Sequence, residues 1–157
     1  VKVAPAGTTV QELIDNYCGG MLEGQIFKGY LPGGASGGIL PAKYSKIPLD
    51  YGSKELSELG CFLGSAAIVV LSNKDNMKDV GLNLLKFFEE ESCGQCTPCR
   101  VGTEKTVKIM KEKIWNKEKL EDLSEVMSEA SICGLGQAAS NPLRSIMKHF
   151  EEEITYD

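Results

Sequence analysis

Three cysteines within seven residues constrain this chain more than any other feature of its sequence. Cys93, Cys96 and Cys99 are each separated from the next by two residues. Three sulfurs therefore lie around one turn of backbone, where they can converge on a single centre. A fourth thiol has to come from elsewhere, and Cys133, which follows after residues 100–132, is the candidate. The spacing predicts one centre with four thiolate ligands.

Three kinds of centre are compatible with this pattern. Three local thiolates and one distant thiolate are typical of a [4Fe–4S] cluster, because one loop can reach three corners of the cube while another segment closes the fourth. Zinc is the main competitor, but structural zinc sites usually draw their ligands from two separate short pairs. A redox disulfide is the third alternative, since Cys96 and Cys99 also form a Cys-x-x-Cys pair. The spacing favours the iron–sulfur cluster.

Glycines lie next to the cysteines and fit the same interpretation. We expect Gly94 to let the backbone turn between two ligands, and Gly134 and Gly136 to do so after the fourth. Backbone N–H groups in such turns can donate hydrogen bonds to sulfur, which raises the reduction potential of a cluster. The alternative is that Gly134 and Gly136 cap a helix and begin a loop.

Composition narrows the class of protein further. A length of 157 residues suits one domain or two small ones, and the net charge of −5 argues against a nucleic-acid partner. No apolar run approaches the roughly 20 residues of a membrane helix. We expect no catalytic residues, because no catalytic triad, zinc-protease motif or dinucleotide fingerprint is present. The cysteine spacing and the lack of a signal peptide favour a reducing cytoplasmic location, and Val1 in place of Met favours a chain cut from a longer one.

The N-terminal half predicts a small α+β unit in which helix packs on sheet. Thr9 and Glu12 form a capping box for a helix over residues 10–17, and Ser53 caps a second over 53–59. Strands are expected over residues 1–3, 26–30 and 66–71, the last of them buried on both faces because it is continuously apolar.

Residues 32–38 form the segment richest in glycine. A phosphate-binding loop is one interpretation, although the Gly-Lys-Ser/Thr ending is missing. A loop against a neighbouring domain and a tight hairpin are the alternatives. The two remaining thiols, Cys18 and Cys61, are expected to be small buried hydrophobic residues, with Cys61 as the reserve ligand.

The C-terminal half predicts four amphipathic helices with short connections, which is typical of a helical bundle. Thr97-Pro98 and Asn141-Pro142 are read as helix caps followed by a first-turn proline. We expect the last apolar stripe to run from Leu143 to Ile154. Helix N-termini near the thiols would favour the extra electron of a reduced cluster and raise its potential. Arg100 could add to this effect, or could be a solvated side chain or the partner of a Glu.

The motif from Glu91 to Gly102 (ESCGQCTPCRVG), followed by Cys133-Gly134-Leu135-Gly136-Gln137, resembles a known family. It is similar to the iron–sulfur end of the NADH-oxidising flavoprotein subunit of respiratory complex I. Relatives of that subunit occur in NAD-reducing hydrogenases and NAD-linked formate dehydrogenases. Residues 28–41 most resemble the formate dehydrogenase branch. The likeness covers essentially the whole chain.

The resemblance implies an α+β chain of two domains. A ubiquitin-like β-grasp (SLBB) domain would span residues 1–72, and an all-α four-helix bundle carrying the [4Fe–4S] cluster would span 73–157. The resemblance implies four cluster ligands: Cys93, Cys96, Cys99 and Cys133.

In the family, FMN and NAD bind to a larger domain that precedes this region. The resemblance therefore implies an electron relay that is not catalytically complete alone. The implied partners are that flavin domain, a thioredoxin-like [2Fe–2S] subunit and a larger iron–sulfur subunit. The alternative is a zinc-stabilised interaction module that uses the same four cysteines.

Overall fold

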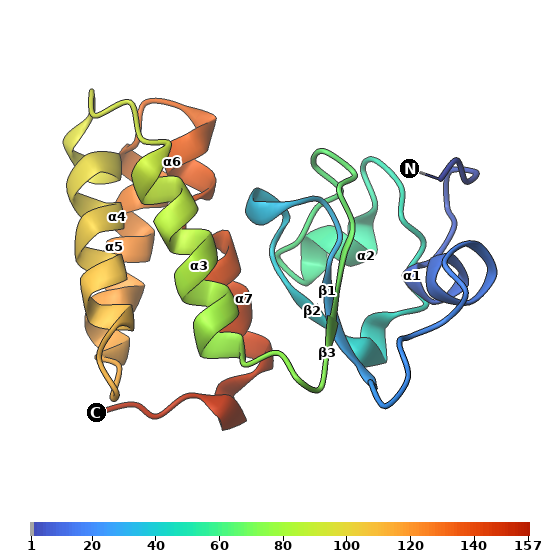
Figure 1. Ribbon diagram of the computed structural model, residues 1–157. Coiled ribbons are helices and arrows are strands. Elements are labelled where there is room, and N and C mark those ends of the chain that lie inside the picture. Colours follow the sequence, from blue (N-terminus) through green and yellow to red (C-terminus); the bar gives the residue numbers. More distant parts are fainter. Residues whose placement is uncertain (1) are drawn as a thin grey trace. The chain divides into compact units, whose positions relative to one another are not determined.

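The computed structural model describes residues 2–157 and has two compact units, residues 1–75 and 76–157 (Figure 1). The first unit contains a three-stranded sheet, and the second contains the long helices. The chain is therefore α+β, as the sequence predicts. No helix among residues 2–157 is both long and apolar enough to cross a membrane.

The sheet of the first unit is antiparallel, with strand order β2-β1-β3. Its strands are β1 (Phe27–Leu31), β2 (Leu40–Pro41) and β3 (Val69–Ser72). Tyr30 in the central strand lies opposite Leu40 on one side and Val70 on the other. The strand expected over 26–30 is thus present, shifted by one residue.

The third strand differs from its sequence prediction. Residues 66–68 lie outside β3, and the side chains of Val69 and Val70 are 45% and 38% exposed. The prediction that this segment is buried on both faces is therefore wrong. β3 is an edge strand, and a unit this small has too few elements to cover both of its faces. The strand expected at 1–3 is also absent at Lys2 and Val3, while Val1 lies outside the described residues.

Both helix caps predicted for the first unit are present. Thr9 accepts a hydrogen bond from the Glu12 backbone, and the Glu12 carboxylate accepts one from the Thr9 N–H at 2.8 Å. The helix begins as α1 (Val10–Glu12) and continues as a π-helical stretch, Leu13–Tyr17. Ser53 caps α2 (Lys54–Glu58) by accepting a hydrogen bond from the Leu56 N–H. Local side chain–backbone hydrogen bonds therefore start both helices.

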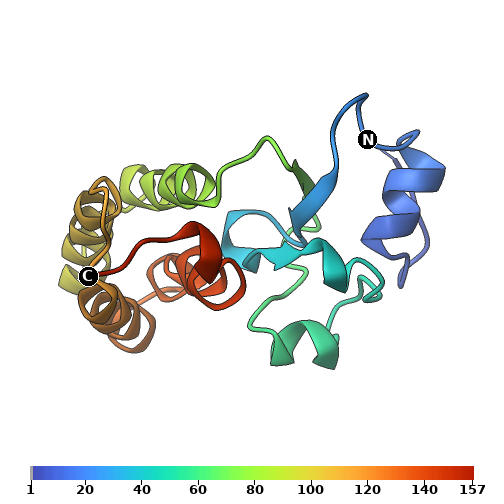
Figure 2. The same cartoon turned by 90° about the horizontal axis from the view of Figure 1, so that it is seen from below.

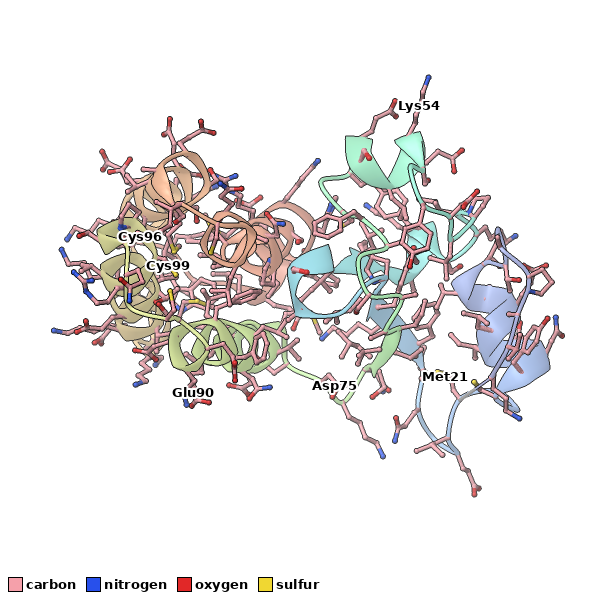
Figure 3. All side chains as sticks on the ribbon, turned by 90° about the horizontal axis from the view of Figure 1, so that it is seen from above. Met21, Lys54, Asp75, Glu90, Cys96 and Cys99 are labelled. Carbon is pink, nitrogen blue, oxygen red and sulfur yellow. The ribbon has the colours of Figure 1, made fainter. Side chains whose placement is uncertain are left out.

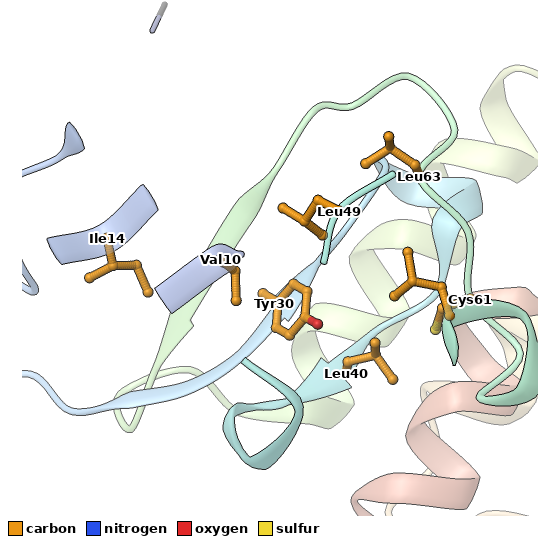
Figure 4. Packing of buried hydrophobic residues seen from close by; sticks show 8 residues of the cluster. Val10, Ile14, Tyr30, Leu40, Leu49, Cys61 and Leu63 are labelled. Atoms are coloured by element: carbon orange, nitrogen blue, oxygen red, sulfur yellow. The ribbon is translucent and has the colours of Figure 1, made fainter. Parts of the chain in front are cut away.

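The first unit has a hydrophobic core between α1, the sheet and the loop after α2 (Figure 4). Tyr30 is fully buried in it, and its hydroxyl donates to the Tyr44 carbonyl at 3.0 Å. The buried members of the core are Val10, Ile14, Tyr30, Leu40, Leu49, Leu56, Cys61 and Leu63. Cys61 is 1% exposed, which confirms its prediction as a core residue. Cys18 is exposed, contrary to prediction, because it ends the π-helical stretch where the chain turns through Gly19.

The glycines of residues 32–38 bring two stretches of backbone into contact. A Cβ on Gly33 would lie 2.0 Å from the Leu63 carbonyl oxygen, and one on Gly37 would lie 2.7 Å from that of Phe62. The Phe62 N–H donates to the Gly37 carbonyl at 3.1 Å, and the Gly34 N–H donates to Ala67 at 2.9 Å. Close packing of the two loops therefore explains why glycine occupies these positions, since side chains there would force the loops apart.

The second unit contains long helices, the short helix α6 and a short 3₁₀-helix, Glu151–Glu153. Its α-helices are α3 (Met77–Glu90), α4 (Thr97–Met110), α5 (Lys117–Ala130), α6 (Gly134–Ala138) and α7 (Asn141–His149). α3 packs against α4 and α7, and α4 packs against α5 (Figure 1). The N-caps of α4 and α7 are Cys96 and Ser140, one residue before the predicted Thr97 and Asn141. The prolines therefore occupy the second helical position in both helices.

The C-terminal segment folds back onto the connection between α4 and α5 (Figure 2). The Trp115 N–H donates to the Thr155 carbonyl at 2.8 Å, and the Asp157 N–H donates to the Trp115 carbonyl at 3.1 Å. α7 ends at His149, so Ile154, which the sequence predicts in the last helix, is buried outside it. Trp115 is fully buried beneath this segment.

Candidate metal centre

All four cysteines of the motif line one cavity in the second unit. Cys93 lies in the connection between α3 and α4, Cys96 is the N-cap of α4, and Cys99 lies in its first turn (Figure 3). Cys133 is the N-cap of α6 and closes the cavity from the second segment. The structure thus brings together the three local thiols and the distant one that the sequence singled out.

The size and lining of this cavity fit a cluster. Its volume is about 190 Å³, several times the roughly 30 Å³ that one water molecule occupies in the liquid. The rest of its lining is formed by Glu91, Ser92, Gln95, Ile132 and Leu135. Among residues 2–157, no group of three or more Cys, His, Asp or Glu side chains is placed so that it could hold a metal ion. The four thiols surround a space with room for a polynuclear centre, and thiolates are the ligands that iron–sulfur clusters use.

The four thiols differ in their exposure to solvent. Cys93 and Cys133 are exposed, Cys96 is partly buried, and Cys99 is 5% exposed. One side of the cavity therefore opens at the surface, while the side at Cys99 is covered by protein.

The loop that carries the first two thiols is held by its own neighbours. Gly94 has φ = +76°, a left-handed conformation that favours glycine, and its N–H donates to the Ser92 hydroxyl at 3.3 Å. The Arg100 guanidinium donates to the Gly94 carbonyl and to the Thr97 hydroxyl. Arg100, whose role the sequence left open, therefore braces the ligand loop from the first turn of α4.

Backbone N–H groups favour the thiolate form of Cys96. The Ile132 N–H, and after it the Cys99 N–H, donate to this sulfur and lower the pKa of the Cys96 thiol. These donors are not the N–H groups of the Gly94, Gly134 and Gly136 turns that the sequence predicts, so that prediction stays open. The Ile132 donor comes from the segment of Cys133, so it also ties the two ligand segments together. Because the thiolate is the form that binds metal, this lowered pKa prepares Cys96 as a ligand.

Gly136 explains how the two ligand segments come so close. A Cβ at this position would lie 2.5 Å from Ser131 Oγ and 2.9 Å from Cys99 Cβ. Both Gly134 and Gly136 lie inside α6, so neither serves the turn or helix end that the sequence predicts for them. The physical role of Gly136 is to let α6 touch the first turn of α4.

Two serines beside the thiols were missed by the sequence analysis. Ser92 Oγ lies 3.4 Å from Cys99 Sγ. Ser131 Oγ is buried and has no hydrogen-bond partner among residues 2–157. The Ser131 side chain nevertheless helps to lower the pKa of the Cys96 thiol. No spacing rule marks a serine as the neighbour of a particular sulfur, so only the folded loops reveal these contacts.

Comparison with known proteins places this centre in a family. The model of the NADH-ubiquinone oxidoreductase-F iron-sulfur binding region matches residues 79–157, which include all four thiols. An NADH-quinone oxidoreductase F-type chain of Rhizobium meliloti (strain 1021) is 35% identical, over 96% of this chain and 37% of the relative. The HndC chain of an NADP-reducing hydrogenase of Solidesulfovibrio fructosivorans is 36% identical, over 95% of this chain and 31% of the relative.

A solved structure supports the same relationship. A crystal structure of an NAD+-reducing [NiFe]-hydrogenase in the H2-reduced state superposes with a TM-score of 0.79 at 27% identity, over 96% of this chain and 26% of the other. The chain thus spans about a third of the length of the relatives that it matches. This chain belongs to the family of the NADH-ubiquinone oxidoreductase-F iron–sulfur binding region, whose cofactor is a [4Fe–4S] cluster.

Proposed function

We propose that this chain relays electrons through one [4Fe–4S] cluster held by Cys93, Cys96, Cys99 and Cys133. One observation carries this proposal: four thiols from two separate segments line a single cavity of about 190 Å³. A bound cluster supplies one-electron oxidation and reduction without making or breaking a bond in a substrate.

The residues of the site would have different roles in such a relay. The exposed thiols of Cys93 and Cys133 bring one edge of the centre to the surface, within reach of an electron-transfer partner. The buried side at Cys99 keeps water away from the centre. The N-terminus of α4, whose N-cap is Cys96, presents partial positive charge to the cavity and favours the more negative, reduced state.

We also propose domain identities for the chain. Residues 1–72 form a ubiquitin-like β-grasp (SLBB) domain, and 73–157 form a four-helix bundle that carries the cluster. The antiparallel sheet packed with α1 supports the first assignment. The packing of α3 against α4 and α7, and of α4 against α5, supports the second.

The parent enzyme is inferred from the relatives, whose names are those of NADH-quinone oxidoreductase, NADP-reducing hydrogenase and NAD+-reducing hydrogenase. We propose that this chain serves an oxidoreductase of that class and is not catalytically complete alone. FMN and NAD would bind a domain outside residues 1–157. A thioredoxin-like [2Fe–2S] subunit and a larger iron–sulfur subunit would be the further partners. The formate dehydrogenase branch, which residues 28–41 favour, stays a prediction.

Metal analysis of protein purified without oxygen tests the relay. We expect about four irons and four sulfides per chain and, after dithionite reduction, the EPR signal of a reduced cubane. Stoichiometric zinc without iron would contradict the proposal and leave an interaction module in which the four cysteines only hold the helices together.

A further inference from the structure

The most buried of the four thiols has a hydroxyl group beside it. Cys99 is 5% exposed, whereas Cys93 and Cys133 are exposed. Water can donate hydrogen bonds to the exposed sulfurs but not to a sulfur covered by protein. At Cys99 the available side-chain donor is Ser92, whose Oγ lies 3.4 Å from the sulfur.

The surroundings of Ser92 determine which of the two groups, Ser92 Oγ or Cys99 Sγ, donates this hydrogen bond. The Gly94 N–H donates to Ser92 Oγ at 3.3 Å, so the hydroxyl oxygen already accepts a hydrogen bond. Its own proton stays available for donation. A thiolate that binds metal has no proton and can only accept. Ser92 is therefore the donor and Cys99 Sγ the acceptor whenever Cys99 is a ligand.

We propose that Ser92 is a positioning residue that raises the reduction potential of the cluster through this hydrogen bond. The proposal rests on the proposed function, because it requires Cys99 to be a cluster ligand. Reduction adds one electron, which increases the negative charge on the ligand sulfurs and strengthens any hydrogen bond that they accept. A donor therefore stabilises the reduced state more than the oxidised state. Burial of Cys99 increases this difference, because electrostatic interactions are stronger where water is excluded.

The test compares variants of Ser92 with and without the hydroxyl in protein loaded with its cluster without oxygen. Ser92→Thr keeps the hydroxyl, and Ser92→Val has a side chain of the same shape as Thr without it. Ser92→Ala removes the group altogether. Ser128→Ala is the matched control, because Ser128 is also a serine of the helical unit but its hydroxyl donates to the Glu125 carbonyl on α5. The midpoint potential of each protein is measured by redox titration followed by EPR, together with its iron content.

We expect Ser92→Ala and Ser92→Val to shift the reduction equilibrium about tenfold toward the oxidised state. For a one-electron couple this is a potential lower by about 59 mV. Ser92→Thr and Ser128→Ala should keep the potential of the unmodified protein. A purely structural role for Ser92 would change cluster retention but would not make the potential follow the hydroxyl.

Two outcomes would overturn the inference. One is equal potentials in the Thr and Val variants at full iron content. The other is loss of iron from both the Ala and Val variants while the Thr variant stays loaded, since the hydroxyl would then be needed to fold the Gly94 turn and not to tune the potential. Failure of the proposed function is separate, because it would show as unmodified protein that binds no iron.

Discussion

Two loops of this protein contain glycine and differ in what they enclose. Residues 32–38 in the first unit press against the backbone of residues 62–64. Backbone hydrogen bonds join the two loops, because the Gly37 carbonyl accepts from the Phe62 N–H and the Gly34 N–H donates to the Ala67 carbonyl. Residues 91–96 in the second unit surround a cavity instead and line it with sulfur. The contrast teaches that glycine density alone does not identify a site. A site also needs reactive side chains that face open space.

The buried cysteines of the two units repeat this contrast. Cys61 is packed among apolar side chains of the first core. Cys99 is also buried, yet it faces the cavity and has the Ser92 hydroxyl as its neighbour. Burial is shared, and the surrounding groups decide whether a thiol is a core residue or a candidate ligand.

The largest effect should come from removing the fourth ligand. We expect Cys133→Ser to lose the cluster or to convert it to a form with fewer irons, because only this thiol closes the cavity from the α6 side. Iron and sulfide content with EPR of the reduced protein measures the change. Cys18→Ser is the matched control, since Cys18 is an exposed thiol of the first unit and its replacement should leave the iron and sulfide content unchanged. Equal cluster content in both variants would break the assignment of Cys133.

Crowding the glycine-rich loop should destabilise the first unit. In Gly33→Ala the new Cβ would lie 2.0 Å from the Leu63 carbonyl oxygen, and we expect a loss of about 3 kcal/mol in the free energy of unfolding. Chemical denaturation followed by circular dichroism measures it. Iron content should not change, because the four thiols lie in the other unit.

Gly52→Ala separates steric crowding from backbone conformation in this experiment. Gly52 has φ = +77° and nothing within 4 Å of its added Cβ, so only conformational strain of about 1 kcal/mol is expected. If the Gly33 variant lost no more stability than the Gly52 variant, the loop–loop contact would not be the reason for these glycines.

The corresponding change in the second unit should act on the cluster. In Gly136→Ala the Cβ would collide with Ser131 and approach Cys99 Cβ at 2.9 Å. We expect the ligand segments to separate and metal affinity to fall about tenfold, measured as the rate of iron loss to a chelator. Gly134→Ala is the control, because Gly134 lies in the same helix and its added Cβ would meet nothing within 4 Å. Identical iron retention in the two variants would show that close packing of α6 is not required.

The smallest effect concerns the C-terminal segment. Tyr156 Oη is buried and has no hydrogen-bond partner among residues 2–157. Tyr156→Phe should therefore be as stable as the unmodified protein or more stable by up to about 1 kcal/mol. Lys117 Nζ lies 5.0 Å from the ring centre, and this cation–π contact survives in Phe. A loss of stability in thermal unfolding would reveal a partner for the hydroxyl.

The same variant has a pH signature. Burial, and after it the charges of Glu151 and Glu121, raise the pKa of Tyr156 from 10.0 to about 12. Because the folded pKa is raised, the neutral ring contributes stability that is fully present below pH 10 and is lost as the pH rises to about 12. Tyr156→Phe should lack this contribution to alkaline destabilisation, which unfolding measured at several pH values from about 9 to about 12 can test.

The sequence was sufficient where a local rule applied. The capping box at Thr9, the cap at Ser53 and the long amphipathic helices depend on contacts within a few residues, and they are present as predicted. Predictions failed where distant segments decide the outcome. The exposure of Val69 depends on what covers the sheet, and the role of Gly136 depends on its contact with Cys99.

The sequence by itself favoured an iron–sulfur cluster over zinc and a redox disulfide, because the number and spacing of the thiols restrict which centre they can hold. It also named the segment that supplies the fourth thiol. Only the tertiary structure decided which thiol is buried, which serine lies beside it, and that α6 touches α4 through Gly136. Ligand spacing is a property of one short stretch of chain, whereas burial and hydrogen bonding to sulfur arise only when separate stretches pack together.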